Sequence, residues 1–367
     1  MLSIPWKNMR AEKARFAFSV LGIAVAALLL AFMIALYRGW NDKIASYVAD
    51  VPADIWVSQP GNQSFFSASI IADTQLAEVG KIEGVTEVSS LLGRSLKVTH
   101  GSDEFDSYIL GFDADGIGGP IHIKKGSGTP GDGEIVMDDV LARTQGIGIG
   151  DEVVANERRL RVVGISTGGN VVINQLSFVS KAEAQKLVGI TGVSNFGLVQ
   201  VERGKTQDVL ARINDGSIAG VNGFDSKTFA HNSRKVLQKS VLPILTVVVL
   251  LVFIVGAVIV GLTMYTATLE KEREYGVMKA LGTPNKFLFY AVLAQSLICG
   301  LVGFVVGEAL VVAATRFAER LVPQFVTLVR WQDALIVLAA VVIMSLLAAY
   351  LPVQRVMRVD PLRVFKA

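Results

Sequence analysis

The chain has little of what soluble enzymes use for chemistry and solubility. Charged residues make up 18% of its 367 residues, whereas average soluble domains carry about 25%. Its one cysteine, Cys299, excludes an internal disulfide framework and a cysteine-based zinc cluster. Its three histidines lie far apart, so no histidine metal site is expected. With 51% hydrophobic residues and a mean hydropathy of +0.49, the composition excludes a disordered protein, a coiled coil and an ordinary cytosolic enzyme, and it indicates a membrane protein with a substantial water-soluble part.

Four long apolar stretches are present, each with at least 21 consecutive uncharged residues. Spanning the hydrocarbon core of a bilayer takes about 20 apolar residues, and buried helices of soluble proteins rarely run so long without a charged face. The first stretch is longer than the apolar region of a signal peptide and no small-x-small cleavage site follows it, so we expect it to be retained. The expected transmembrane helices cover residues 16–37, 241–269, 287–315 and 334–354.

Lysine and arginine predict the orientation of these spans. Twelve of them lie in segments 1–15, 270–286 and 355–367, against three in segment 316–333. By the positive-inside rule both termini are cytoplasmic, and segment 38–240 is extracytoplasmic. That segment holds 20 basic and 24 acidic residues, so the overall charge of +3 comes from the membrane part. The basicity is therefore a topology signal, and it does not support nucleic-acid binding.

Segment 38–240 shows a mixed α and β pattern. Alternating strand-like residues predict one hairpin over 95–112 and another over 153–165. Short helices are expected from Asp73-Thr74 to near Lys81, after Ser180, and from Lys205-Thr206. Residues 82–88 and 218–224 each follow a helix and carry a Gly-Val turn before an edge-like strand. Two such halves suit a ferredoxin-like module, although chance similarity explains the echo equally well.

No catalytic constellation is found in the sequence. Gly204-Lys205-Thr206 resembles the end of a phosphate-binding loop but lacks its glycine spacing, so we interpret it as a turn before a helix. With no other such loop, this polypeptide is not expected to hydrolyse ATP itself. We expect no catalytic residue, no metal and no cofactor, and the sequence does not indicate substrate-binding residues. Residues 50–66, with Trp56 and Phe65-Phe66, are either a contact surface or ordinary packing.

The loop at 270–286 is the most informative segment. Charged residues come first, and an apolar set follows in which Tyr275, Met278 and Leu281 recur at three-residue spacing, with Val277 four residues before Leu281. This pattern predicts a helix with one charged and one apolar side. Gly282 can end the helix, and Thr283-Pro284 can begin the next one. A short amphipathic helix that is rigidly joined to two spans can transmit mechanical force to them.

Two further patterns concern the membrane part. Leu2, Trp6 and Met9 fall on one helical face, which suits an amphipathic helix over 1–15 at the cytoplasmic interface or a simple basic anchor. Cys299, Gly303 and Gly307 recur at four-residue spacing, and small residues let helices approach closely. We expect packing within the protomer here, with a dimer contact as the alternative.

Three segments resemble a known family. Residues 272–282 resemble the loop signature of MacB/FtsX-like ABC transporter permeases, and 352–362 resemble the C-terminal ending of that family. Residues 149–153 followed by 161–165 are similar to its periplasmic core domain. The order of one span, a large outer domain and three spans also matches. The DevC-like permeases of heterocyst exporters, which lack a fused ATPase, are the subtype that the chain most resembles.

The resemblance implies the fold, the partners and the location. The fold class is a membrane protein with four transmembrane helices and a large mixed α/β extracytoplasmic domain between the first and second spans. The partners would be two copies of a separate ABC ATPase subunit, a second copy of this chain or a close relative, and a membrane-fusion adaptor or another extracytoplasmic protein. The chain would be a multi-pass protein of the bacterial cytoplasmic (inner) membrane, in contact with the lipid bilayer and with no nucleic acid.

The resemblance also implies a function and a site. The chain would be a permease subunit that couples ATP hydrolysis on its partner to movement of the outer domain, for export or extrusion of a lipid, peptide or small molecule by mechanotransmission. Alternatives are a signalling subunit that drives an outer partner such as a cell-wall hydrolase, and a membrane-bound enzyme. The residues that match the coupling motif are Glu272, Arg273, Glu274, Tyr275, Gly276, Lys279 and Gly282. Without the resemblance, a solvated loop explains these charges equally well.

The sequence is therefore expected to divide into nine segments. They are a cytoplasmic amphipathic helix (1–15), the first span (16–37), an extracytoplasmic α/β domain with a stalk (38–240), the second span (241–269), a coupling-helix loop (270–286), the third span (287–315), an outer loop (316–333), the fourth span (334–354) and a cytoplasmic tail (355–367).

Overall fold

The computed structural model describes residues 13–171, 175–322 and 325–357. The chain divides into two compact units. The helical unit comprises the chain up to Arg38, 242–321 and the chain from Thr327, and the sheet unit comprises 39–241 with 322–326. Most of the expected N-terminal amphipathic helix (1–12) and most of the expected tail (358–367) lie outside the described residues.

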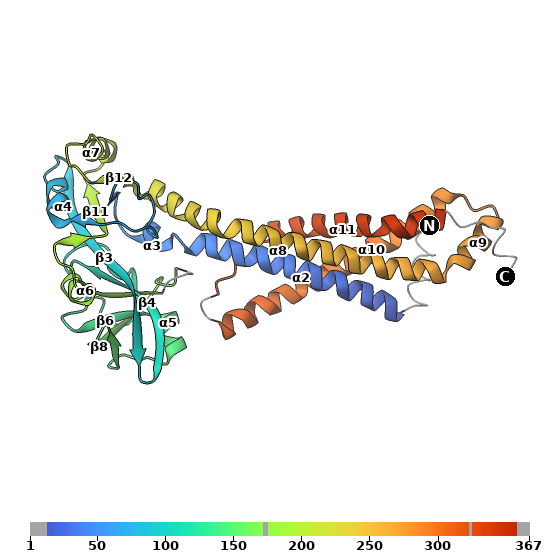
Figure 1. The fold of residues 1–367 in the computed structure, drawn as a ribbon, viewed down its shortest axis with the longest axis horizontal. Coiled ribbons are helices and arrows are strands. Elements are labelled where there is room, and N and C mark those ends of the chain that lie inside the picture. The colour runs from blue at the N-terminus through green and yellow to red at the C-terminus, as the bar shows by residue number, and fades with distance from the viewer. Residues whose placement is uncertain (1–12, 172–174, 323–324, 358–367) are drawn as a thin grey trace. The chain divides into compact units, whose positions relative to one another are not determined.

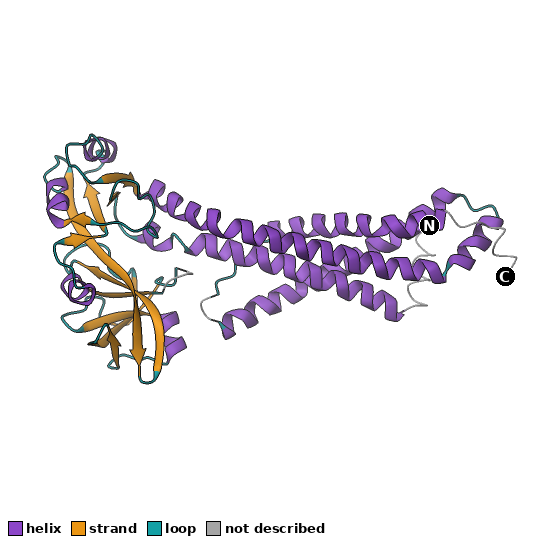
Figure 2. Cartoon of the chain, viewed as in Figure 1, coloured by secondary structure: helices purple, strands orange, loops and turns teal. Residues whose placement is uncertain are grey.

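Four long helices form most of the helical unit (Figure 2). They are α2 (Lys13–Lys43), α8 (Ser226–Glu270), α10 (Asn285–Leu321) and α11 (Trp331–Met357), and the short α9 (Glu272–Ala280) lies between α8 and α10 in the chain. Each of the four long helices is long and apolar enough to cross a membrane. This confirms the predicted fold class of four spans with a mixed α/β domain between the first and second.

Glycines of α10 let its neighbours approach closely. A Cβ added to Gly303 would lie 2.6 Å from Cβ of Ile23, and one added to Gly307 would lie 2.7 Å from Cβ of Ala27, both on α2. On another side of α10, the Ser296 hydroxyl donates to the Ser345 carbonyl of α11 at 2.8 Å. The predicted packing of these small residues within the protomer is therefore confirmed.

One half of the sheet unit has the predicted ferredoxin-like arrangement. Its strands lie in the order β12-β1-β11-β3, and each neighbouring pair is antiparallel. Two β-α-β units interlock to give this order. They consist of β1 (Ile55–Ser58), α4 (Asp73–Val79) and β3 (Val85–His100), and of β11 (Phe196–Val201), α7 (Thr206–Ile213) and β12 (Asn222–Asp225). Gly204, with a φ of 84°, forms the turn before α7, as predicted.

The sheet continues into the other half of the unit through β3, whose second part pairs with β4 (Figure 1). Both predicted hairpins are confirmed, as β3–β4 and β7–β8. The remaining elements are α3 (Ser46–Asp50), β2 (Ile71–Ala72), β4 (Asp103–Phe112), β5 (His122–Gly126), β6 (Glu134–Asp138), α5 (Asp139–Gln145), β7 (Glu152–Ala155), β8 (Arg158–Thr167), β9 (Leu176–Ser180), α6 (Lys181–Val188) and β10 (Val193–Ser194).

An aromatic cluster fills the core of the sheet unit where α3 and the start of α8 join it. The Trp56 ring stacks on Phe229 of α8 with centroids 5.1 Å apart, and it meets Phe65 edge-on at 6.0 Å. Tyr47 of α3 is buried in the same cluster, and its hydroxyl donates to the Gly118 carbonyl. Trp56 and Phe65 are buried. Ordinary packing is therefore the correct interpretation for these two side chains, and the prediction that they form a contact surface is wrong.

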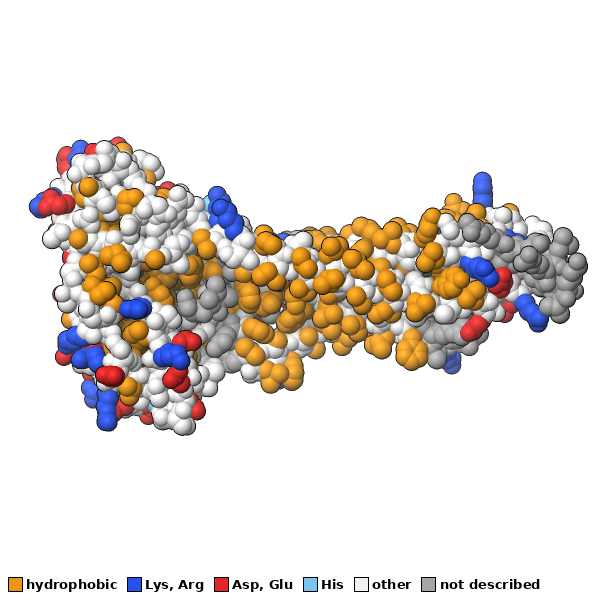
Figure 3. Space-filling view, viewed as in Figure 1, with side chains coloured by type: hydrophobic (Ala, Val, Ile, Leu, Met, Phe, Trp, Pro, Cys, Tyr) orange, Lys and Arg blue, Asp and Glu red, His pale blue; other side chains and the backbone are white. Residues whose placement is uncertain are grey.

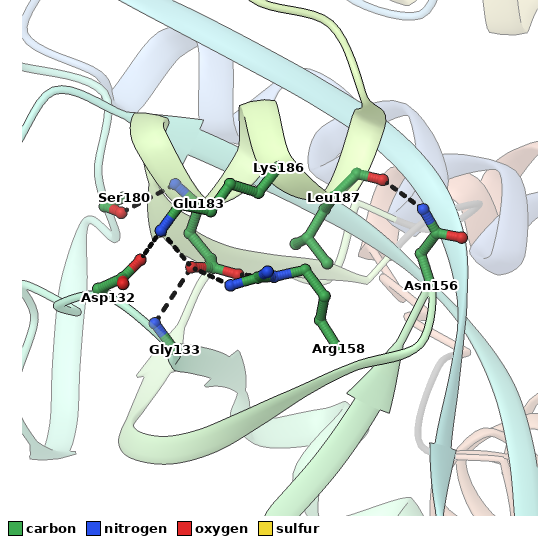
Figure 4. Close-up of polar contacts among 8 residues, drawn as sticks. All are labelled: Asp132, Gly133, Asn156, Arg158, Ser180, Glu183, Lys186 and Leu187. Atoms are coloured by element: carbon green, nitrogen blue, oxygen red, sulfur yellow. Dashed lines mark hydrogen bonds and ion pairs between the residues drawn. The ribbon is translucent and has the colours of Figure 1, made fainter.

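An ion pair between a buried carboxylate and a half-buried arginine joins α6 to β8 (Figure 4). The Glu183 carboxylate is fully buried and accepts from Nε of Arg158 at 2.6 Å and from the backbone N–H of Gly133 at 3.2 Å. The Ser180 hydroxyl accepts from the backbone N–H of Glu183, which caps the helix where the sequence predicts. Because a buried carboxylate needs hydrogen-bond partners for its oxygens, this network fixes the position of α6 relative to β8.

Candidate functional site

The helix α9 contains most of the predicted coupling residues. Glu272 and Glu274 occupy its first turn and Lys279 its last turn, which suits the helix dipole. The helix ends at Ala280, and Gly282 has a φ of 89°. The N–H of Gly282 donates to the Lys279 carbonyl at 2.9 Å and the N–H of Thr283 to the Met278 carbonyl at 3.0 Å. These two bonds form a Schellman motif, so the predicted termination by Gly282 is confirmed.

One face of α9 packs against two long helices of the same unit. Tyr275 is buried in a cluster with residues of α10 and α11, and Met278 packs against that cluster. Gly276 is also buried. The cluster residues besides Tyr275 are Leu288 and Val292 of α10 and Val353 and Val356 of α11. The helix α9 is therefore attached by apolar contacts to both neighbours.

Polar contacts reinforce this attachment at both ends of α9. Nη2 of Arg355 donates to Oε2 of Glu272 at 3.2 Å, and Nζ of Lys279 donates to the Met357 carbonyl at 2.9 Å. Burial lowers the pKa of Lys279. The structure thus brings Glu272 and Lys279 to the side of α9 that faces the end of α11. Sequence reasoning did not place Arg355 at this site; it used Arg355 as a topology signal and as part of the C-terminal resemblance.

The opposite face of α9 is exposed and combines apolar and charged side chains. Arg273 and Glu274 are exposed, as are Val277 and Leu281, the latter at 81%. The predicted division into a charged and an apolar side is therefore wrong, because Val277 and Leu281 do not share a face with Tyr275. At 100° per residue, Val277 points about 200° away from Tyr275. Residue spacing alone did not separate these two apolar sets.

Charged side chains gather at the α9 end of the helical unit. On the face seen in Figure 3, hydrophobic side chains cover the middle of the long helices, and lysine, arginine and acidic side chains lie near α9. Within the described residues, no group of three or more His, Cys, Asp or Glu side chains is placed to hold a metal ion. The exposed apolar and charged side chains at α9 suit a contact with another protein.

Two family models match the chain. The model of the FtsX-like permease C-terminal region matches residues 246–361, which include α9. The model of the MacB-like periplasmic core domain matches residues 16–216, more than half of the chain. The chain belongs to the MacB/FtsX family of ABC transporter permeases. As such a permease it works with a partner ATPase subunit, and it is a membrane protein.

Relatives match this permease along its whole length. An uncharacterized ABC transporter permease of Mycobacterium tuberculosis is 25% identical over 371 residues, covering 100% of this chain and 99% of the relative. A Staphylococcus haemolyticus protein, HrtB, whose name describes a hemin transport system permease, is 20% identical over 369 residues, covering 98% of each chain.

Two solved structures are similar to part of the permease. The periplasmic region of MacB from Actinobacillus actinomycetemcomitans has a TM-score of 0.39 and 11% identity, and covers 50% of this chain and 94% of that one. The extracellular domain of the noncanonic ABC-type transporter YknZ from Gram-positive bacteria has a TM-score of 0.37 and 14% identity, and covers 47% of this chain and 100% of that one.

Proposed function

We propose that α9 receives the motion of a separate ATPase subunit and passes it to α10 and α11. The observation that carries the proposal is the division of α9 into two faces. Tyr275, Glu272 and Lys279 hold one face, whereas Arg273 and Glu274 on the other face and Leu281 directly after the helix are exposed. An exposed leucine beside charges of both signs suits the centre and rim of a protein interface. A helix that is fixed to two neighbours transmits displacement instead of absorbing it.

The complete assembly would contain two copies of this chain and two ATPase subunits. Both termini and α9 would be cytoplasmic, in line with the excess of lysine and arginine in those segments. The sheet unit would lie outside the cytoplasmic membrane and move with each ATPase cycle. This chain would carry no catalytic residue, and an adaptor or other outer partner would bind the sheet unit.

The motion would serve export or extrusion by mechanotransmission. The name of the staphylococcal relative supports transport over signalling, and it makes hemin the first cargo to test. Proteoliposomes with the partner ATPase should then show ATP-dependent movement of hemin. A subunit that stimulates its ATPase, moves neither hemin nor lipids nor peptides, and activates an outer cell-wall hydrolase would be a signalling subunit instead.

Stimulation of the partner ATPase in nanodiscs tests the coupling site. Leu281→Asp and Glu274→Lys should each reduce stimulation at least about tenfold, because a buried charge or a reversed charge at an interface costs more than about 1.4 kcal/mol. Gly276→Leu should also uncouple the ATPase, because Gly276 is buried and a leucine side chain at this position would displace α9.

Val329→Asp is the matched control, because Val329 is exposed in the same unit but lies outside α9. It should leave stimulation unchanged, and all variants should insert into the membrane in normal amounts. Normal stimulation in Leu281→Asp, Glu274→Lys and Gly276→Leu would remove the assignment of α9 as the coupling site.

A further inference from the structure

The strand β3 has a gap in its pairing along one edge. On that edge β11 pairs with β3 as far as Leu91 and β7 pairs with it from Val98, and no strand of the described residues pairs with 92–97 between them. On the other edge β4 pairs with β3 continuously from Leu91 to His100 (Figure 1). At 3.3–3.4 Å per residue the gap is about 20 Å long. An unpaired strand edge is a template for another extended chain.

Backbone hydrogen-bonding groups of β3 face this gap. The N–H of Gly93 donates to Oδ1 of Asn195 at 2.6 Å, and the N–H of Asn195 donates to the Leu91 carbonyl at 2.7 Å. The Asn195 side chain therefore takes the place of a paired strand at one end of the gap. Because alternate residues of a strand direct their N–H and C=O groups to the same edge, Ser95 and Lys97 direct theirs into the gap as Gly93 does.

A cavity of about 610 Å³ lies beside the gap and is lined by aromatic side chains that include Phe65, Phe66 and Tyr108. A Cβ on Gly93 would lie 2.5 Å from Cε1 of Tyr108, so glycine lets the tyrosine ring lie against the strand. Ile70, 61% exposed, lies on another wall of the cavity. Because side chains of a strand alternate between its two faces, every second side chain of an added strand would reach this apolar lining.

Charge beside the gap favours an acidic partner. Arg94 is exposed and lines the same cavity, and it forms no ion pair with the part of the chain that the structure describes. Lys97 is also exposed, and it pairs with Glu104 on the neighbouring strand β4. Because side chains of a strand alternate between its two faces, Arg94 lies on the face of β3 opposite Gly93. There it complements a carboxylate of an incoming segment whose apolar side chains occupy the other face.

We propose that residues 92–97 of β3 bind an extended segment of a partner protein by strand addition, with apolar side chains alternating with acidic ones. Only another polypeptide backbone complements the alternating N–H and C=O groups of the edge, and an acyl chain offers neither donor nor acceptor. The site shares no residue with α9. The proposal therefore goes beyond the coupling function, and its test does not depend on that function.

The test uses the full chain in nanodiscs and a panel of synthetic seven-residue peptides. In the three parent peptides, valine alternates with glutamate, lysine or serine. Each parent peptide has a control twin in which alternate amides carry N-methyl groups. The twin keeps the side chains but lacks the N–H groups that would pair with the strand. The glutamate peptide should bind saturably at one per chain and at least tenfold more tightly than its twin and than the lysine peptide. In hydrogen exchange, it should slow the Ser95 or Lys97 amide at least tenfold, while the exposed turn amide of Gly101 stays unchanged.

Two variants test the charge. Arg94→Gln should weaken binding of the glutamate peptide at least about fivefold, whereas Arg159→Gln, at another exposed arginine that lies outside the cavity lining, should not. Several results would overturn the proposal: equal binding of the N-methylated twin, unchanged exchange at both amides, no binding by any parent peptide at 1 mM, or saturable binding of oleate at this site without any peptide binding.

Discussion

Nη2 of Arg38 donates to Oδ1 of Asp333 at 3.0 Å and joins α2 to the first turn of α11. The two residues lie at opposite ends of the sequence, and the Asp333 side chain is only 8% exposed. A second contact lies close by, because the N–H of Leu328 donates to the Ala35 carbonyl at 3.0 Å. The helices α2 and α11 are therefore tied where α11 begins.

We expect Arg38→Gln to lower the stability of the helical unit by about 1–3 kcal/mol, because it leaves the buried Asp333 carboxylate without its cation. Thermal unfolding in nanodiscs measures the change. Arg330→Gln, at an exposed neighbouring arginine, is the control and should have little effect. If the double variant Arg38→Gln with Asp333→Asn loses the sum of the two single losses, the residues are not coupled and the pair does not stabilise the fold.

Gly303→Val should weaken the packing of α10 on α2. The added Cβ would lie 2.6 Å from Cβ of Ile23 and 3.1 Å from the Val20 carbonyl oxygen, so one helix has to move. Overpacking of this kind costs about 1–3 kcal/mol. Thermal unfolding should show the loss, whereas Val305→Leu, at a position that is 64% exposed on the same helix, should not. Equal stability of the two variants would contradict the close contact.

Gly282→Ala should destabilise the end of α9 without affecting the long helices. Its φ of 89° lies in the left-handed region, where a residue with a Cβ is less stable by about 1 kcal/mol. Amide hydrogen exchange of Lys279 to Thr283 should therefore accelerate several-fold. Gly148→Ala is a control, because Gly148 does not have a positive φ. Unchanged exchange around Gly282 would mean that the Schellman motif does not set the end of the helix.

The buried Asp138 should make the stability of the sheet unit depend on pH. Burial raises its pKa to about 6, against 3.8 for the exposed group, although the backbone N–H groups of Val140 and Gly169 donate to it. The folded state therefore holds this proton more tightly than the unfolded state. The contribution of Asp138 to stability is therefore full below about pH 4 and is lost as pH rises through 6, by up to about 3 kcal/mol.

Chemical unfolding of the full chain at pH 4 to 7.5, followed by tryptophan fluorescence because Trp56 is buried in the sheet unit, checks this dependence. Comparison with Asp138→Asn removes the contribution of all other groups. The difference in unfolding free energy between wild type and variant should change across pH 4–6 and stay constant above pH 7. A difference that is constant over the whole range would show that Asp138 does not titrate as expected.

Local patterns predicted most of the elements. The hairpin over 95–112 follows from alternation around a Gly-Ser-Asp turn, and the start of α6 follows from Ser180, whose hydroxyl does cap it. The ferredoxin-like order was predicted only as one of two explanations, because pairing between β1 and β12 depends on residues almost 170 positions apart. The extent of β3, from 85 to 100, was also not predicted, because its first half pairs with β11 and its second half with β4.

The sequence by itself determined the four apolar spans, the position of the mixed domain between the first two, and the helix that Gly282 ends, because each depends on run length or on neighbours within a few residues. The tertiary structure alone decided that Tyr275 turns inward while Leu281 is exposed. It also decided that, among the described residues, no strand pairs with the edge of β3 opposite β4 at Ser95. An apolar side chain is buried only where another element comes to cover it, and a strand edge is paired only where another strand reaches it, and both depend on segments far away in the chain.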